Sequence, residues 1–487
     1  MDTQSASKEA ESARVPAGNE CRGVAQASAA IVHGDDHRAP ATMAAGRDGD
    51  DSVPAFACAC TYACTSAPAL GRIGDPVDVT AACRDLVRRC AMSNWVHQFS
   101  FPCAEPSESV FEPIVTSYGV AVANCLLERH ADDIARASDG LVEFIRRWTV
   151  APPVSTTAWD IAFGRAHLII QKGRHDAAGA LDAAVRVGLR LAAGGQSGRW
   201  SAQLAPTSIQ LDDRVVDAVE QIEVHVDEVS WDAGTRLCLR LADGSALLWR
   251  RDGNQWAGAG GSRLASVGST RPIYLLPRQA WPADENGGDV FRTCQPVDHI
   301  SPSMAQSFED GLSVLQKNVP DYLPWVERVL NGIVVCPVEA QRRLVSGSWE
   351  DVPGFVCISS PHGGIDIAET LVHACAHQYF YMLQRVGAVD DASDRTLYWS
   401  PPIGKKHPLS RILMAYHALA NVQLLYDAVR RNTANPPQDL RYVANNEPGL
   451  QAAIRALDTP LRDNPALTTL GRALYAPLAA RLAALSH

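Results

Sequence analysis

The chain has 487 residues, of which 46% are hydrophobic and 20% are charged, a balance typical of globular proteins with roughly two or three folded units. The net charge of −10, with no basic block, argues against nucleic-acid binding, and no apolar run approaches the ~20 residues that span a bilayer. No apolar signal-peptide core follows the N-terminus and the thirteen cysteines are scattered, so we expect a cytoplasmic protein with reduced thiols. The sequence does not indicate an oligomeric state.

The first 75 residues are rich in Ala, Ser, Gly and Asp and hold few bulky apolar side chains. Such a segment cannot offset the entropy lost on ordering, so we predict that residues 1–75 form a disordered tail. Three cysteines in this tail, Cys58, Cys60 and Cys64, could hold a metal through their thiolates. Because no partner Cys or His follows at zinc-site spacing, we interpret them as free thiols.

Hydrophobic periodicity divides the rest of the chain into four predicted regions. Apolar residues recur at three- and four-residue intervals in residues 76–200, which predicts a helical N-terminal region. In residues 205–290 the period changes to two, and Asp243-Gly244 joins two apolar runs as a hairpin turn, so we expect a small antiparallel β-rich module. Residues 303–432 combine helices with short buried strands, and residues 433–487 are predicted to form a C-terminal helical cap. The predicted fold class is therefore α+β and mostly α-helical.

Two histidines are the feature on which the functional interpretation depends. His373 and His377 lie four residues apart in an amphipathic run that we expect to end at Gly387. On a helix, that spacing places both imidazoles on one face, roughly 6 Å apart along the axis, so that they can converge on one metal ion. A second predicted helix, Pro408 to Arg431, carries His417 on its apolar face. This third histidine would complete a metal site between neighbouring helices.

A zinc metallopeptidase is disfavoured by the residue that follows the first histidine. In such enzymes this residue is a glutamate, which acts as general base on the metal-bound water. Here it is Ala374, which cannot accept a proton. Glu369 lies one turn before His373 and about 12 Å of helix rise from His377, too far for both to bind one ion. We therefore expect Glu369 to orient the His373 ring through a hydrogen bond.

Several segments around the histidines match a known pattern in order and spacing. They are Ile367 to His373 with His377, then Tyr398 to Pro401, then Pro408-Leu409 with the helix of His417, and the preceding buried strand Gly354 to Ser359. With these segments, residues 306–432 resemble the bacterial HExxH-motif putative peptide-modification proteins, which are described as iron- and 2-oxoglutarate-dependent HExxH-type peptide β-hydroxylases. The resemblance covers about a quarter of the chain. We accordingly expect a zincin-like helical metal-site domain with short strands for residues 303–432.

The resemblance implies an iron(II) site held by His373, His377 and His417, with 2-oxoglutarate as the cosubstrate. The substrate would be a ribosomally synthesised precursor peptide, hydroxylated at a β-carbon. Three imidazoles would also suit zinc or cobalt. A dicarboxylate cosubstrate needs a fixed cation and further donors. The candidate residues for binding it are Ser400, Lys405, Lys406 and Arg411.

The chain differs from the family's pattern at several positions. Besides Ala374, which replaces the motif glutamate, His407 stands where a basic residue is expected before Pro-Leu, and Pro402-Ile403 replaces an expected Trp-Arg pair. These changes leave two alternatives open. One is a catalytically inactive relative that binds a peptide or a partner protein, and the other is a histidine cluster that holds no metal.

Overall fold

The computed structural model describes residues 96–102, 110–172, 176–227, 236–252, 255–280, 295–338 and 344–485. The predicted tail, residues 1–75 with its three cysteines, lies outside these ranges. Within them the fold mixes helices with antiparallel and mixed β-sheets, and helix is the commoner structure, as the sequence predicts. No helix in the described ranges is both long enough and apolar enough to cross a membrane.

The N-terminal helices pack against one another and against the first sheet. They are α3 (Phe111–Ala137), α4 (Leu141–Val150), α5 (Ile161–Lys172) and α6 (Ala177–Ala193), whereas the short α2 (His97–Ser100) packs against α9 (Gly364–Val386) and α12 (Thr469–Leu485). Asp176 caps α6 by accepting a hydrogen bond of 2.9 Å from the Gly179 amide, which satisfies one free N–H group of the first turn. Gly140 joins α3 to α4 with a left-handed φ of +73°, at a point where a Cβ would meet the carbonyl of Arg199 at 2.6 Å. The helical pattern predicted for residues 76–200 is thus present in the described part of that region.

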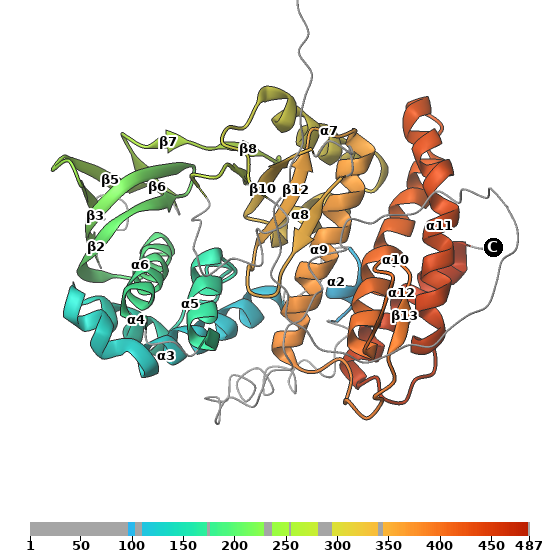
Figure 1. Ribbon diagram of the computed structural model, residues 1–487, viewed down its shortest axis with the longest axis horizontal. Coiled ribbons are helices and arrows are strands. Elements are labelled where there is room, and N and C mark those ends of the chain that lie inside the picture. The colour runs from blue at the N-terminus through green and yellow to red at the C-terminus, as the bar shows by residue number, and fades with distance from the viewer. Residues whose placement is uncertain are drawn as a thin grey trace, which may run out of the picture. The chain divides into compact units, whose positions relative to one another are not determined.

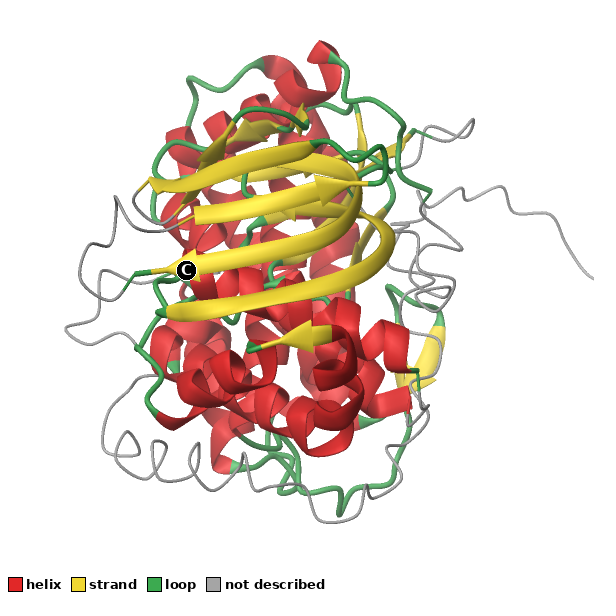
Figure 2. Cartoon of the chain, turned by 90° about the vertical axis from the view of Figure 1, so that its left-hand side faces the viewer, coloured by secondary structure: helices red, strands yellow, loops and turns green. Residues whose placement is uncertain are grey.

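Strands of the first sheet run antiparallel and pack against these helices (Figure 2). The path is β1 (Ser138–Asp139), β2 (Gly198–Leu211), β3 (Arg214–Val226), β4 (Arg236–Leu241), β5 (Ala246–Asp252) and β6 (Gln255–Gly258), with β7 (Ser262–Arg263) paired to β3. Along β3, Ile222, Val224 and Val226 are buried and alternate with more exposed residues, which is the period of two seen in the sequence. The predicted turn at Asp243-Gly244 joins β4 to β5, and Gly244 has a φ of +82° there.

A second sheet has the strand order β11 (Ser346–Ser348), β12 (Phe355–Ser360), β10 (Gly332–Pro337), β9 (Ile273–Leu276) and β8 (Ala265–Val267). The three inner strands run parallel, and both edge strands run antiparallel to their neighbours. Because β8 and β9 fall within residues 205–290, the structure divides the predicted β-rich module between two sheets. The short run around Ile273 and Leu275 is buried, and such a run shows no alternation that assigns it to one sheet rather than the other.

The helix that carries His373 and His377 lies among the C-terminal helices (Figure 1). The elements are α7 (Pro302–Asn318), α8 (Tyr322–Val329), α9 (Gly364–Val386), the hairpin of β13 (Tyr398–Ser400) and β14 (Lys405–His407), α10 (Leu409–Arg431), α11 (Pro437–Leu461) and α12 (Thr469–Leu485). Helix α9 packs against both α7 and α10, and α10 in turn packs against α11 and α12. Gly387 ends α9 as expected, but in an extended conformation (φ 176°) rather than the left-handed one typical of a helix-ending glycine.

We predict that Gly311→Ala lowers the free energy of unfolding by about 1–3 kcal/mol. A Cβ at Gly311 on α7 would lie 2.5 Å from Cγ2 of Ile367, which is fully buried on α9. The two helices would have to separate, and this cost exceeds the ~1 kcal/mol that alanine gains over glycine inside a helix. Urea denaturation monitored by circular dichroism measures the change.

Gly387→Ala is the matched control. Its Cβ would meet nothing closer than Leu470, at an ordinary contact distance of 3.7 Å, and its extended backbone suits any residue. We expect this variant to change the free energy of unfolding by less than about 0.5 kcal/mol. Equal losses in the two variants would show that close approach of α7 and α9 does not explain the effect.

Candidate functional site

Helix α9 buries most of its length, the two histidines included. His373 is 7% exposed and His377 is 6% exposed. Their ring centroids lie 4.6 Å apart in an edge-to-face arrangement, so the spacing brings the imidazoles together on one helix face. Burial holds the pKa of His377 well below its ordinary value, and His373 and His417 act in the same direction. His377 is therefore neutral at physiological pH, which is the form of imidazole that binds metal ions.

His417 lies near this pair but is held by a different part of the chain. Its side chain is fully buried on α10, and Nε2 donates to the carbonyls of Phe99 at 2.8 Å and Ser100 at 2.9 Å. Because a carbonyl only accepts, Nε2 must carry the hydrogen, and the neutral ring keeps its lone pair on Nδ1. Nδ1 is buried and makes no hydrogen bond of good geometry among the described residues, although the backbone of Ala376 lies close enough to raise the pKa of the ring slightly. Burial lowers the pKa of His417 to about 4, so the ring stays neutral.

The three histidines do not form a ready-made metal site. In the ranges that the structure describes, no group of three or more His, Cys, Asp or Glu side chains is arranged to hold a metal ion. His373 and His377 converge, whereas His417 remains a neighbour with one free nitrogen. A site with all three as ligands would need the rings to move closer together than they are here.

Glu369 joins three helices. Its Oε2 atom accepts hydrogen bonds from the hydroxyls of Tyr426 on α10, at 2.5 Å, and Tyr442 on α11, at 2.8 Å. Burial, and after it the charge of this carboxylate, raises the pKa of both tyrosines, so both remain protonated donors. This role could not be predicted from the sequence, because the partner tyrosines lie 57 and 73 residues away. The hydrogen bond expected between Glu369 and His373 stays a prediction.

The β13–β14 hairpin adds buried polar atoms near the histidines. Ser400 is 1% exposed, and its Oγ atom has no hydrogen-bond partner among the described residues. The Nε2 atom of His407 is also buried and also has no hydrogen-bond partner among the described residues. Burial lowers the pKa of His407, and the positive charges of Arg411 and Lys405 lower it further. The positive charge of Arg411 also lowers the pKa of His377, so this charge acts on both the hairpin and the helix of the two histidines.

Strand register separates the two predicted lysines. Ser400 pairs with Lys405, and Trp399 pairs with Lys406. Adjacent residues of a strand point to opposite faces, so Lys405 shares a face with Ser400 and His407 whereas Lys406 shares the other with Trp399. Both lysines are exposed. Of the two, Lys405 alone is on the side of the buried polar atoms.

Two groups that position the site were not found from the sequence. Gln378 follows His377 directly, is fully buried, and accepts a hydrogen bond of 3.0 Å from the Gly354 amide. A polar amide inside a run of apolar residues is a signal that could have identified it. The carbonyls of Phe99 and Ser100, which hold His417, had no such signal, because any residue has a carbonyl.

We predict that Glu369→Ala lowers the free energy of unfolding by about 1–3 kcal/mol, because it removes the acceptor of the buried Tyr426 hydroxyl and one of the acceptors of the partly buried Tyr442 hydroxyl. Urea denaturation measures this. The control is Glu309→Ala on α7, an exposed position where we expect a change under about 0.5 kcal/mol. Unchanged stability in Glu369→Ala would mean that the two hydrogen bonds do not hold the helices together.

Comparison with known proteins assigns the chain to no family. No family model matches it, and no curated protein matches it. The resemblance to HExxH-motif peptide-modification proteins therefore remains a hypothesis that the residues of this chain alone support.

Proposed function

We propose that the chain is a metal-dependent, 2-oxoglutarate-type peptide hydroxylase, with His373, His377 and His417 as the iron(II) ligands. The observation that carries the proposal is the state of His417, a buried neutral ring with one nitrogen fixed and the other unpaired. Metal-binding histidines typically donate their second N–H to a carbonyl or carboxylate, which fixes the tautomer and aims the free nitrogen. The paired rings of His373 and His377 supply two further imidazoles.

The three histidines are suitable ligands for iron(II) by chemical type, but their arrangement fits the ion only in part. Two rings are together, and the third must approach them, since no three-ligand group is preformed in the described residues. When bound, iron(II) with 2-oxoglutarate would supply the oxygen activation that hydroxylates a β-carbon. The chain's own contribution would be to exclude water around His373 and His377 and to hold the cosubstrate.

Arg411 is the best candidate for holding the cosubstrate. The positive charge of Arg411 lowers the pKa of both His377 and His407, so Arg411 is within electrostatic reach of the histidine helix and of the hairpin. The Arg411 guanidinium donates a weak hydrogen bond of 3.6 Å to the sulfur of Met414. A guanidinium binds a carboxylate through two parallel hydrogen bonds, and the buried Oγ of Ser400 offers a further donor.

The zincin-like layout proposed for this domain has support in how α9 meets the second sheet. The edge strand β11 runs antiparallel to β12, and α9 packs against it. Tyr381 donates a hydrogen bond of 3.1 Å to the carbonyl of Ser348, and Gln378 donates one of 2.9 Å to the hydroxyl of the same residue. These contacts set α9 along the edge strand, with its histidines next to Gln378.

A peptide partner is supported by exposed apolar side chains beside the hairpin. Leu397 is 55% exposed and Trp399 is 54% exposed, although both are large hydrophobic residues. Trp399 lines an open cleft of about 920 Å³, together with Arg462 and Asn464. Exposed aromatic residues at the rim of a cleft are typical anchor points for a bound peptide.

One observation favours a second function, in which the chain binds a peptide without modifying it. The described residues hold no preformed three-ligand group, and Ala374 stands in place of the motif glutamate. In this alternative the histidines are core residues, and the cleft beside Trp399 is the functional surface. Metal and peptide binding must therefore be tested separately.

We predict that the purified chain binds a single iron(II) under anaerobic conditions, and that added 2-oxoglutarate then produces a visible charge-transfer band. His373→Ala and His377→Ala should abolish iron binding, and His417→Ala should weaken it at least tenfold. Arg411→Gln should retain iron but require at least tenfold more 2-oxoglutarate to give the band, because a charged hydrogen bond worth about 1.5–3 kcal/mol is lost. Calorimetry and absorption spectroscopy measure these quantities.

His225→Ala is the control, because His225 lies on β3, where it accepts a hydrogen bond from Arg199 and has no contact with the site. It should bind iron as the wild type does. Absence of iron binding in the wild-type protein would overturn the oxygenase and leave the second function.

We further predict that peptides selected from a display library on the wild-type protein bind Trp399→Ala at least tenfold more weakly, since an aromatic anchor contributes about 2 kcal/mol or more. Leu248→Ala is the matched control, because Leu248 is equally exposed, at 54%, but lies on β5 of the first sheet. Equal affinity for all three proteins would exclude the cleft as the peptide site. Competent binding by His373→Ala would show that it does not depend on the metal.

A further inference from the structure

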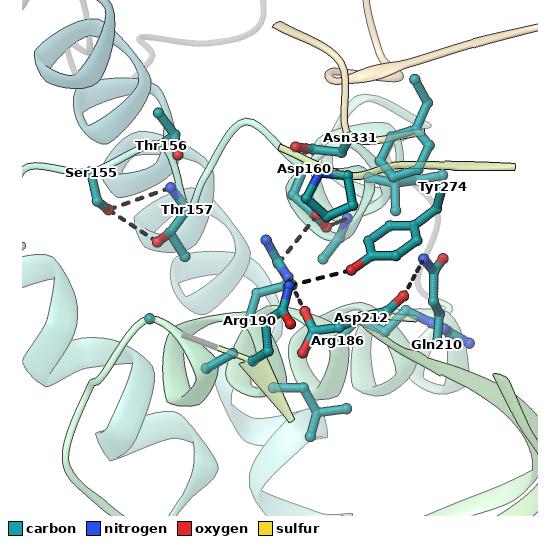
Figure 3. Close-up of a pocket in the computed structure, with 18 of the residues that line it drawn as sticks. Ser155, Thr156, Thr157, Asp160, Arg186, Arg190, Gln210, Asp212, Tyr274 and Asn331 are labelled. Carbon is teal, nitrogen blue, oxygen red and sulfur yellow. Dashed lines mark hydrogen bonds and ion pairs between the residues drawn. The ribbon is translucent and has the colours of Figure 1, made fainter. Parts of the chain in front are cut away.

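A separate cavity of about 450 Å³ lies between the N-terminal helices and the two sheets (Figure 3). Its walls come from α5 and α6, from the end of β2, and from β9 and β12. None of the candidate site residues proposed from the sequence lines it, and of the matched segments only the strand Gly354 to Ser359 reaches it, through Phe355. Its volume falls within the range of small-molecule sites, about 300–1,000 Å³.

Arginines dominate the charge of this cavity. Four guanidiniums line it, those of Arg165, Arg186, Arg190 and Arg271. Arg190 lies between two carboxylates, at 3.2 Å from Asp160 and 3.3 Å from Asp212, as Figure 3 shows. The other two carboxylate contacts, from Arg165 at 3.2 Å and Arg186 at 2.9 Å, both go to Asp182. Each carboxylate of the cluster is therefore already paired, which leaves none to attract a cation.

Of these four arginines, Arg271 alone has no carboxylate partner among the described residues. It donates to the side-chain oxygen of Asn331 and, at 3.4 Å, to the carbonyl of Arg328, both of them neutral acceptors. Among the described residues, no carboxylate lies within ion-pairing distance of it. Burial lowers the pKa of Arg271, and the nearby charge of Arg190 lowers it further. Four arginines against three aspartates leave one positive charge without a partner in a partly buried place, and this arrangement favours an anion.

Asn331 holds Arg271 in position before any ligand arrives. Asn331 is 9% exposed, and its Nδ2 atom donates a hydrogen bond of 2.5 Å to the carbonyl of Trp159, next to Asp160. Its amide oxygen is thereby directed at Arg271. A guanidinium fixed in this way loses little further freedom when it binds a carboxylate or a phosphate.

The rest of the lining is neutral and combines polar groups with apolar side chains such as Ile161, Leu189 and Phe355. Ser155, Thr157, Gln210, Gln255 and Tyr274 contribute hydroxyl or amide groups to the cavity. Burial raises the pKa of Tyr274 to about 12, so its hydroxyl remains a donor. These groups suit the hydroxyl or amide groups of a polar molecule, and the apolar part of the wall can pack against its carbon skeleton.

We propose that this cavity binds a small polar anion, a molecule with one carboxylate or phosphate group that pairs with Arg271. The shared chemistry is a planar or tetrahedral set of anionic oxygens facing a guanidinium. This site is independent of the histidine cluster, so it stands or falls apart from the peptide hydroxylase.

Isothermal titration calorimetry of the full chain with inorganic phosphate, and separately with malonate, tests the proposal. We expect saturable binding of at least one of the two at millimolar concentration. Binding of phosphate alone identifies a phosphorylated ligand, and binding of malonate alone identifies a carboxylate. Binding of neither anion would overturn the proposal.

Variants then locate the binding site. Arg271→Gln should bind the anion at least tenfold more weakly, whereas Arg271→Lys should retain most of the affinity because it keeps the charge. Arg146→Gln is the control, since Arg146 is 53% exposed on α4 and pairs with Glu143 away from the cavity. Equal affinity in Arg271→Gln and the control would show that the anion binds elsewhere and would overturn the assignment.

Gln255→Glu keeps the test decisive if Arg271→Gln fails to fold. Gln255 is exposed at the mouth of the cavity and lies 3.4 Å from the hydroxyl of Tyr274. A carboxylate here leaves the core intact and should repel the anion, lowering its affinity at least tenfold. Unchanged affinity in Gln255→Glu would contradict a site in this cavity.

Discussion

The buried amide of Gln378 fixes the orientation of helix α9, and the functional interpretation depends on that orientation. Its oxygen accepts from the Gly354 amide at 3.0 Å, and its nitrogen donates to the Ser348 hydroxyl at 2.9 Å and to the Phe355 carbonyl at 3.3 Å. A buried amide without these partners would cost about 1–3 kcal/mol, so rotation of α9 about its axis is strongly opposed. Because His377 is the preceding residue, the same bonds decide which way the histidine face points.

On the other side of α9, polar contacts of a different kind hold α10. Glu369 binds Tyr426, and His417 binds the carbonyls of Phe99 and Ser100. Tyr426 and His417 are fully buried and Glu369 is partly buried, and in such places a hydrogen bond is stronger and a missing one more costly than in water. His417 can therefore be part of the core and still offer a ligand atom. Its Nε2 atom fixes the ring through hydrogen bonds to the two carbonyls, and its Nδ1 atom remains to bind another group.

The sequence predicted what periodicity and local spacing control. The helices of the N-terminal region, the hairpin at Asp243-Gly244 and the joint burial of His373 and His377 follow from patterns a few residues long. It could not assign β9 to a sheet, because a short buried run lacks alternation. Nor could it find the carbonyls that hold His417, which lie more than 300 residues earlier in the chain. The arginine cavity was missed for the same reason, since its charges come from segments far apart in the sequence.

The cavity and the histidine helix are joined by hydrogen bonds through a single turn. Asn331, which holds Arg271, donates its backbone amide to the Gly354 carbonyl at 2.7 Å, and the Gly354 amide donates to Gln378. Gly354 has a φ of +80°, and a Cβ there would lie 2.6 Å from the Asn331 side chain, so no other residue fits the turn. Coupling between two sites requires an element with two alternative arrangements. This turn is buried and fully hydrogen-bonded in one arrangement, and it therefore serves as a rigid support that both sites share rather than as a switch between them.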